Sequence, residues 1–152
     1  MNTDLIYMRA AIAQADKSLH EGGIPIGAAL VIDDTLVGLG HNRRIQSGSP
    51  ILHGETDCLQ NAGRRTPLEY RQATLYTTLS PCIMCTGTIL LYKIPRVVIG
   101  ENSNFQGAER LLVQHGVEVI NLEDNGIRET LRSYIERHPD IWFEDIGTTA
   151  QD

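Results

Sequence analysis

Apolar residues recur along the chain with two different periods, and these periods predict both helices and strands. Near the N-terminus the apolar positions fall at steps of three and four, the stripe of an amphipathic helix that ends at Gly22–Gly23. A run of strand length follows at 26–32, and the turn Asp33-Asp34 joins it to a second strand over 36–40. The stripe of the first helix consists of Leu5, Met8, Ile12, Ala15 and Leu19.

The rest of the chain alternates between segments of strand and of helical character. Segments rich in β-branched residues predict three further strands, and the segments between them carry helical patterns. Ser80-Pro81 predicts a helix start, with the proline at the first helical position, where a missing N–H does no harm. We expect strands at 73–78, 96–100 and 117–122, helices at 53–62, 80–92, 108–115 and from 127 to a break at Pro139, and loops at 42–52 and around Pro67.

Helices and strands that alternate after an opening hairpin are typical of layered α/β domains. We therefore predict a sheet of about five strands, covered by helices on both faces. The 152 residues are enough for one domain with one hydrophobic core, and no internal repeat or linker divides them. A single domain over residues 1–152 is the expected organisation.

Composition and charge narrow the class of function. The chain is 41% apolar and 21% charged, as in globular proteins. No apolar run approaches the ~18–20 residues that cross a bilayer, and the N-terminus lacks the layout of a secretory signal, so we expect a cytoplasmic protein without membrane contact. The net charge of −6 argues against a nucleic-acid partner. Three cysteines indicate reduced thiols rather than a disulfide framework.

The motif that carries chemistry is His53-Gly-Glu55 followed by Pro81-Cys82-Ile-Met-Cys85. Cysteines three residues apart on one helix lie on the same face, close enough to bind one metal ion. His53 supplies a third ligand if the N-termini of the two helices lie side by side. Three protein ligands instead of four leave a position for water, which is typical of catalytic zinc sites.

Glu55 lies two residues after His53 and is expected to approach the metal-bound water without being a ligand. A Cys-x-x-Cys pair by itself fits a redox site as well as a metal site. The upstream His-x-Glu and the proline before Cys82 favour zinc, because this combination is the signature of zinc deaminases. Cys58 is interpreted as a small buried hydrophobe. The histidines without metal-ligand spacing are His20, His41, His115 and His138.

In these motifs the chain resembles the cytidine-deaminase-like superfamily, and within it the yeast-type cytosine deaminases that act on the free base. The C-terminal segment Trp142-Phe-Glu-Asp-Ile-Gly147 points to this branch. The resemblance implies a three-layer α/β/α sandwich with a central five-stranded mixed sheet, one catalytic Zn²⁺ per chain, a homodimer, and conversion of cytosine to uracil and ammonia. The segments that carry it also include 21–27, 40–43, 52–55, 74–82, 84–87 and 100–105.

The resemblance also implies roles for individual residues. It makes His53, Cys82 and Cys85 the zinc ligands, and Glu55 the proton shuttle. Their residue types alone would make Asn42 a turn residue, Asp145 a surface charge and the C-terminal aromatics part of the core. The residues assigned to the base are Asn42 and Asp145 at its edge, Phe105, Trp142 and Ile26 as walls, and the backbone of Gly54 and Ser80 at the border of the pocket.

The sequence leaves other functions open. A deaminase of the same fold can act on isocytosine, guanine, a pterin or adenosine in transfer RNA. A non-catalytic zinc-binding module is a second alternative, although the intact Glu55 and the missing fourth ligand argue against it. A redox protein is the third.

Overall fold

The computed structural model describes residues 2–152, and its centre is a five-stranded sheet. The strands are β1 (Gly27–Ile32), β2 (Thr35–His41), β3 (Ala73–Leu79), β4 (Arg96–Glu101) and β5 (Glu118–Asn121). Their order in the sheet is β2-β1-β3-β4-β5. β1 runs antiparallel to both of its neighbours, whereas β3, β4 and β5 are parallel. The mixed five-stranded sheet expected from the sequence is therefore confirmed.

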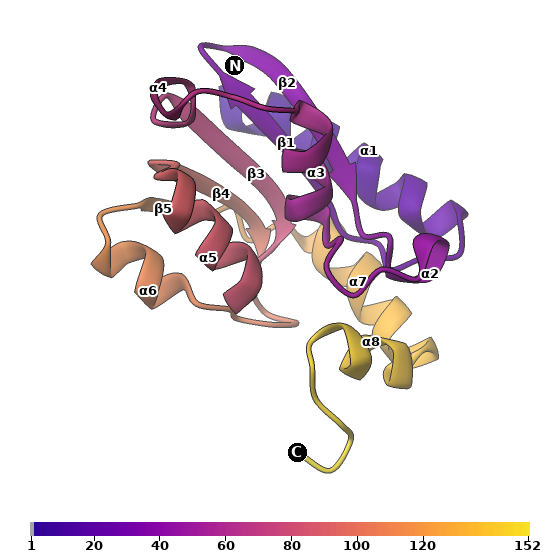
Figure 1. Ribbon diagram of the computed structural model, residues 1–152. Helices are drawn as coiled ribbons and strands as arrows, with labels where there is room; N and C mark the ends of the chain where they lie inside the picture. The colour runs from indigo at the N-terminus through magenta and orange to yellow at the C-terminus, as the bar shows by residue number, and fades with distance from the viewer. Residues whose placement is uncertain (1) are drawn as a thin grey trace.

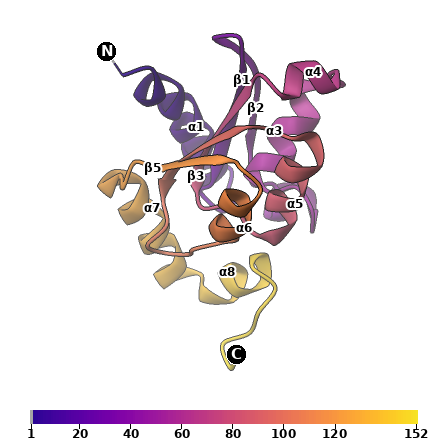
Figure 2. The same ribbon diagram turned by 90° about the vertical axis from the view of Figure 1, so that its left-hand side faces the viewer.

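Helices cover both faces of this sheet, as Figures 1 and 2 show. One face carries α1 (Thr3–His20) and α7 (Asn125–Arg137), and the other carries α3 (Gly54–Ala62), α5 (Ile83–Tyr92) and α6 (Glu109–Gln114). The short helices are α2 (Arg44–Ser47), α4 (Pro67–Tyr70) and α8 (Pro139–Asp145). The result is the expected three-layer sandwich. Within residues 2–152 we find no helix with the length and apolar character that a membrane span requires.

Strand β1 shows why the segment 26–32 is apolar at nearly every position. Ala28 and Leu30 belong to the core under α3, α5 and α6, whereas Ala29 and Val31 belong to the core under α1 and α7. Because both faces of the strand are buried, no polar residue alternates with the apolar ones. A third cluster, which includes Leu79 and Trp142, lies where α8 docks at the end of the sheet.

The helix expected to begin at Ser80-Pro81 begins later than the sequence predicts. α5 starts at Ile83, and Cys82 is its N-cap with extended backbone angles of φ −66° and ψ 175°. Ser80 is still bonded to the neighbouring strand, because its N–H donates to the carbonyl of Glu101 at 3.1 Å. Pro81 also disfavours the helical conformation in the residue before it, Ser80. Cys82 is therefore a capping residue and not part of the helix.

Two segments expected to be loops contain short helices. The first is α2 within 42–52, and the second is α4, which begins at Pro67 after a capping box between Thr66 and Glu69. The helix break expected at Pro139 is confirmed, because α7 ends at Arg137, but Pro139 also begins a further helix that the sequence did not predict. It occupies the first turn of α8, where proline needs no hydrogen-bond partner. This unpredicted helix covers the candidate site.

Close packing between β2 and α3 depends on Gly40. A Cβ at this position would lie 2.1 Å from the backbone nitrogen of Cys58. We expect Gly40→Ala to lower the free energy of unfolding by roughly 1–3 kcal/mol, measured by urea denaturation, because α3 must move away from the sheet. The control is Gly87→Ala in α5, where a Cβ meets nothing within 4 Å. That change should be neutral or stabilising by up to about 1 kcal/mol, and equal effects of the two variants would contradict the packing described.

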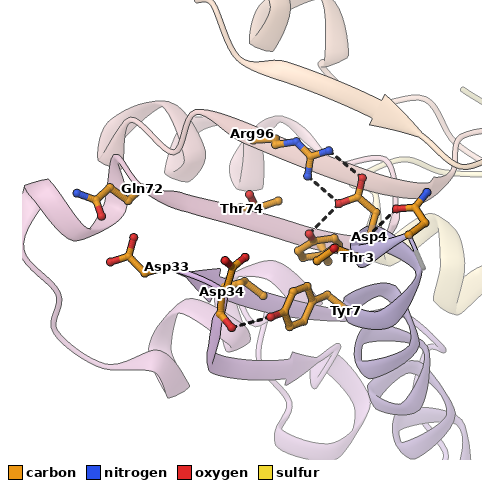
Figure 3. A pocket seen from close by; sticks show the side chains of 11 residues that line it. Thr3, Asp4, Tyr7, Asp33, Asp34, Gln72, Thr74 and Arg96 are labelled. Carbon is orange, nitrogen blue, oxygen red and sulfur yellow. Dashed lines mark hydrogen bonds and ion pairs between the residues drawn. The ribbon is translucent and has the colours of Figure 1, made fainter.

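A hollow of about 430 Å³ lies between the start of α1 and the β1–β2 turn (Figure 3). Its cation, Arg96, is already engaged, since two guanidinium nitrogens donate to the two carboxylate oxygens of Asp4, each at 2.8 Å. The hydroxyl of Tyr76 donates to Asp4 at 2.9 Å, and that of Tyr7 to the carbonyl of Asp34 at 2.7 Å. The hydrogen bonds from Arg96 keep the pKa of Asp4 below its usual value. These contacts hold the start of α1 against the sheet.

Candidate active site

Two helix N-termini bring three metal-ligating side chains together at one end of the sheet. His53 is the N-cap of α3, Cys82 is the N-cap of α5, and Cys85 lies in the first turn of α5. One ligand atom from each of them lies within 4.8 Å of the others, and Cys82 Sγ is 3.4 Å from His53 Nδ1. Within residues 2–152 no other group of three such side chains converges. One imidazole and two thiols fit a zinc ion with one open position.

The surroundings of the two thiols favour metal binding. The hydrogen bond from Cys85, helped by the nearby His53, lowers the pKa of Cys82 to about 4. The hydrogen bond to Cys82 and burial raise the pKa of Cys85 well above its usual value. One thiolate is thus preformed, and the second proton leaves when a metal binds, because a coordinated thiol is deprotonated.

The ring of His53 is fixed from both sides. Nδ1 faces Cys82, and Nε2 lies 3.3 Å from Oδ1 of Asp145. Burial opposes a charge on the ring, but the hydrogen bonds to Asp145 and Cys82 dominate and raise the pKa of His53 to about 10. A metal held at Nδ1 would displace the proton there, while Nε2 would keep its own proton and donate it to Asp145. A carboxylate in this place fixes the tautomer and orientation of a metal-binding histidine.

Glu55 lies beside the metal ligands without joining them. It follows His53 in the first turn of α3, is 4% exposed and lines the same pocket. Burial, followed by the negative charge of Cys82, raises the pKa of Glu55 to about 7. A carboxyl group with this pKa can accept and donate a proton near neutral pH, which suits general acid–base catalysis.

A small pocket of about 20 Å³ opens at the metal ligands. The rings of Phe105 and Trp142 meet edge to face over it, with their centroids 6.2 Å apart and an interplanar angle of 81°. Leu79 at the end of β3, Ile26 just before β1 and Ile146 just after α8 add apolar surface. The pocket is therefore flat-walled and apolar, with its polar groups gathered at the metal end.

Asp145 lines this pocket, and Asn42, which lies behind the lining, contacts it although the two residues are 103 positions apart in the chain. Nδ2 of Asn42 donates to both carboxylate oxygens of Asp145, each at 3.1 Å. Oδ1 of Asn42 accepts the backbone N–H of Arg44 at 3.0 Å, which decides which end of the amide faces Asp145. Asp145 thereby contacts both Asn42 and His53, and all three are largely buried.

The remaining residues expected from the sequence lie close to the same place. Gly54 is buried at the start of α3 and packs over the backbone of Gly27. Ser80 lines the pocket, but its hydroxyl points to the segment that joins β4 to α6. There it donates to Glu109 at 2.6 Å and accepts the N–H of Gly107 at 2.9 Å. Sequence reasoning missed the pocket residues Leu79 and Ile146. Their positions next to Ser80 and Asp145 were the available signal.

Sequence reasoning also missed Glu101, which positions Phe105. Its carboxylate is 1% exposed and accepts the N–H groups of Ser103 at 2.6 Å and of Asn104 at 3.1 Å, and the side-chain amide of Asn104 at 2.9 Å. These bonds fold the loop after β4 back toward α8. A carboxylate at a strand end looks like a surface charge in the sequence, and the Asn-Ser-Asn turn after it was the only hint.

Residues 1–101 match the family model of the cytidine and deoxycytidylate deaminase zinc-binding region. The chain belongs to this deaminase family. The matched residues include His53, Cys82 and Cys85, so these side chains form the zinc site of the deaminase. The zinc cofactor and the hydrolytic enzyme class expected from the sequence are confirmed.

Individual relatives of the deaminase differ in what they are named for. Cytosine deaminase of Candida albicans is 54% identical over 141 residues, which cover 92% of this chain and 94% of the relative. A tRNA-specific adenosine deaminase of Streptococcus pyogenes is 38% identical over 107 residues, 69% of this chain and 67% of the relative. The structure of guanine deaminase from Nitrosomonas europaea aligns with a TM-score of 0.70 at 20% identity, covering 84% of this chain and 82% of that one, and shows the shared fold.

Proposed function

We propose that this deaminase hydrolyses free cytosine to uracil and ammonia. The observation that carries the proposal is a buried carboxylate, Glu55, which lies beside a three-ligand zinc site but is not one of the ligands. The identity of 54% to the cytosine deaminase of Candida albicans supports this choice of ring. A small pocket under two aromatic side chains suits a flat heterocycle.

Glu55 moves the protons of the proposed reaction. Zinc in the site supplies Lewis acidity, which makes water a nucleophile near neutral pH. Glu55 accepts one proton from the water and gives it to the ring nitrogen next to the carbon that bears the amino group. The oxygen adds to that carbon, and the second proton of the water then passes through Glu55 to the amino group. The carbon–nitrogen bond breaks, ammonia leaves and a carbonyl remains.

The other polar residues of the pocket bind the ring in this proposal. Asn42 and Asp145 contact its edge, where each can exchange its present mutual hydrogen bond for one to the base. A site built to hydrogen-bond a polar edge rejects analogues that lack it. The faces of the ring are covered by Phe105, Trp142 and Ile26, and its border by the backbone of Gly54 and Ser80.

Adenosine in transfer RNA is the strongest competing substrate, because a tRNA-specific adenosine deaminase is 38% identical over 107 residues. Two observations favour the free base. The net charge of −6 opposes binding of a polyanion. Trp142, which is 4% exposed, covers the pocket and suits a ring without an attached chain.

A substrate panel tests the proposal. Zinc-loaded protein is incubated with cytosine, isocytosine, guanine, a pterin, cytidine and transfer RNA, and ammonia release is measured. We expect cytosine to exceed cytidine and guanine in kcat/KM by at least about 100-fold, since the pocket discriminates by polar contacts. Faster release from guanine or transfer RNA would assign the deaminase to that substrate instead, and ammonia release in the presence of a zinc chelator would remove the metal from the reaction.

We further propose that residues 1–152 act as one deaminase domain in the cytoplasm and that two copies form a homodimer. All three cysteines are free thiols, which suits a reducing compartment. α5 exposes the apolar side chains of Ile83 and Leu91 about two turns apart, which suits contact with a second copy. Sedimentation should then give twice the chain mass of 16.8 kDa.

A further inference from the structure

His41 is buried directly before Asn42, at the last position of β2. Its Nε2 lies 2.8 Å from Oε1 of Glu21, and its Nδ1 lies 3.3 Å from Oε1 of Gln14. Both ring nitrogens therefore face oxygen atoms contributed by α1 and its C-cap. The side chain is only 5% exposed, and it belongs neither to the metal ligands nor to the pocket lining.

The opposite side of His41 is held by α3. Its backbone N–H donates to Oδ2 of Asp57 at 3.0 Å, and the same oxygen lies 3.9 Å from Nδ1 of the ring. Asp57 is 1% exposed and follows the zinc ligand His53 by one helical turn. It also accepts the side-chain amide of Asn61 at 3.3 Å. His41 thus joins α1, β2 and α3 at the point where the chain leaves the sheet toward Asn42.

A second set of hydrogen bonds runs from Glu21 to the backbone of Asn42. The side-chain amide of Gln46 donates to Oε1 of Glu21 at 3.3 Å and to Oγ of Ser18 at 3.0 Å. Ser18 in turn donates to the carbonyl of Asn42 at 2.9 Å, and the N–H of Asn42 donates to the carbonyl of Ile26 at 2.9 Å. The backbone of Asn42 is therefore fixed at both its N–H and its carbonyl group.

We propose that His41 is a positioning residue for base recognition. The bridge of Glu21, His41 and Asp57, whose His41 and Asp57 are buried, sets the backbone of Asn42 so that its amide reaches Asp145 at the pocket. Without the imidazole, the carboxylates of Glu21 and Asp57 would lose the ring that lies between them and have fewer hydrogen-bond donors. The end of β2 would then shift. The inference rests on the proposed role of Asn42 in binding the edge of the base.

His41→Gln tests the inference, because glutamine keeps a similar size but cannot place one polar atom against Glu21 and a second against Gln14 as the two ring nitrogens do. We expect the KM for cytosine to rise about 10- to 100-fold, as small displacements of binding groups do. kcat should change less than about threefold, since Glu55 and the metal ligands are untouched, and one zinc per chain should remain. The control is His115→Gln, an exposed histidine whose ring contacts only the carbonyl of Leu111, and it should leave KM unchanged.

Glu21→Gln changes the half-exposed end of the same bridge. It is the variant to use if His41→Gln folds poorly. If the two residues act through one another, the double variant should raise KM no more than the worse single variant. Additive effects on KM would overturn the bridge as a unit. An unchanged KM in folded, zinc-loaded His41→Gln would overturn the positioning role, even if its Tm falls.

Trp142, the sole tryptophan, gives a readout that does not depend on turnover. It lies on α8 three residues before Asp145, so loss of the contact between Asn42 and Asp145 should loosen α8. We expect acrylamide to quench Trp142 fluorescence more strongly in His41→Gln than in the wild type or His115→Gln. Stronger quenching together with no wild-type activity on cytosine would support the bridge and refute the proposed substrate. Unchanged quenching would speak against the bridge.

Discussion

Glu55→Gln should lower kcat for deamination by about 10⁴-fold while zinc stays bound, because an amide of the same shape cannot accept or carry a proton. Glu55 is 4% exposed and has a pKa of about 7, so the wild-type group is ready to exchange protons at neutral pH. Each turnover of the proposed reaction needs two proton transfers through Glu55, and water has little room in the pocket to replace this side chain. Ammonia release under steady-state conditions and zinc content by atomic absorption measure the two parts of this prediction.

Glu118→Gln is the matched control for this variant. Glu118 is an exposed carboxylate at the start of the edge strand β5, outside the candidate site, and it pairs with Arg96 at 3.1 Å. Its loss should leave kcat, KM and zinc content unchanged. A Glu55→Gln enzyme with wild-type kcat would exclude Glu55 from proton transfer, whereas a variant that loses zinc would show that the carboxylate supports the metal.

Cys85→Ser should abolish activity by removing the metal. Cys85 is fully buried and is one of the three side chains that converge on the zinc position. We expect zinc affinity to fall by more than about 100-fold, beyond the loss caused by changing partners outside the ligand shell. Because bound metal stabilises the folded state by about 4 kcal/mol at 1,000 times its Kd, chelation should lower the Tm of the wild type but not that of Cys85→Ser. Zinc titration and thermal melts with and without chelator measure both effects.

Cys58→Ala distinguishes the loss of a ligand from the loss of a buried thiol. Cys58 is also fully buried, but it packs in the core of α3, and burial raises its pKa well above the usual value. Removing its sulfur should cost about 1 kcal/mol of stability through a small cavity and leave zinc and activity intact. A Cys85→Ser protein with full zinc and activity would dismantle the metal site described here.

The central strands of the sheet could be predicted from the sequence because they are buried on both faces. β1 shows this directly, since its apolar run continues through Ala28 to Ile32 without a polar interruption. The metal ligands could be predicted for another reason, since His53 lies two residues before Glu55 and Cys82 three residues before Cys85 in a known pattern. Local spacing of this kind survives even where the secondary structure was wrong, as at the start of α5.

The rest depended on contacts between residues far apart in the chain. The residue type of Asp145 alone would make it a surface charge. The family resemblance assigned it to the edge of the base, and only the fold shows its contacts with Asn42 and His53. Glu101 is similar, because its burial comes from the loop it organises. α8 was missed because proline after a helix usually marks an end, and here it begins the next helix. Such residues follow from tertiary packing, which periodicity does not encode.

The site residues on α8 come from a different part of the chain than the metal ligands. All three metal ligands lie before residue 101, within the portion shared by the family, whereas Trp142 and Asp145 come from the last helix. In the proposed site, the metal ligands and two of the side chains that contact the ring therefore come from different stretches of sequence. Exchange of the final helix between family members would be expected to change the preferred ring while keeping all three zinc ligands.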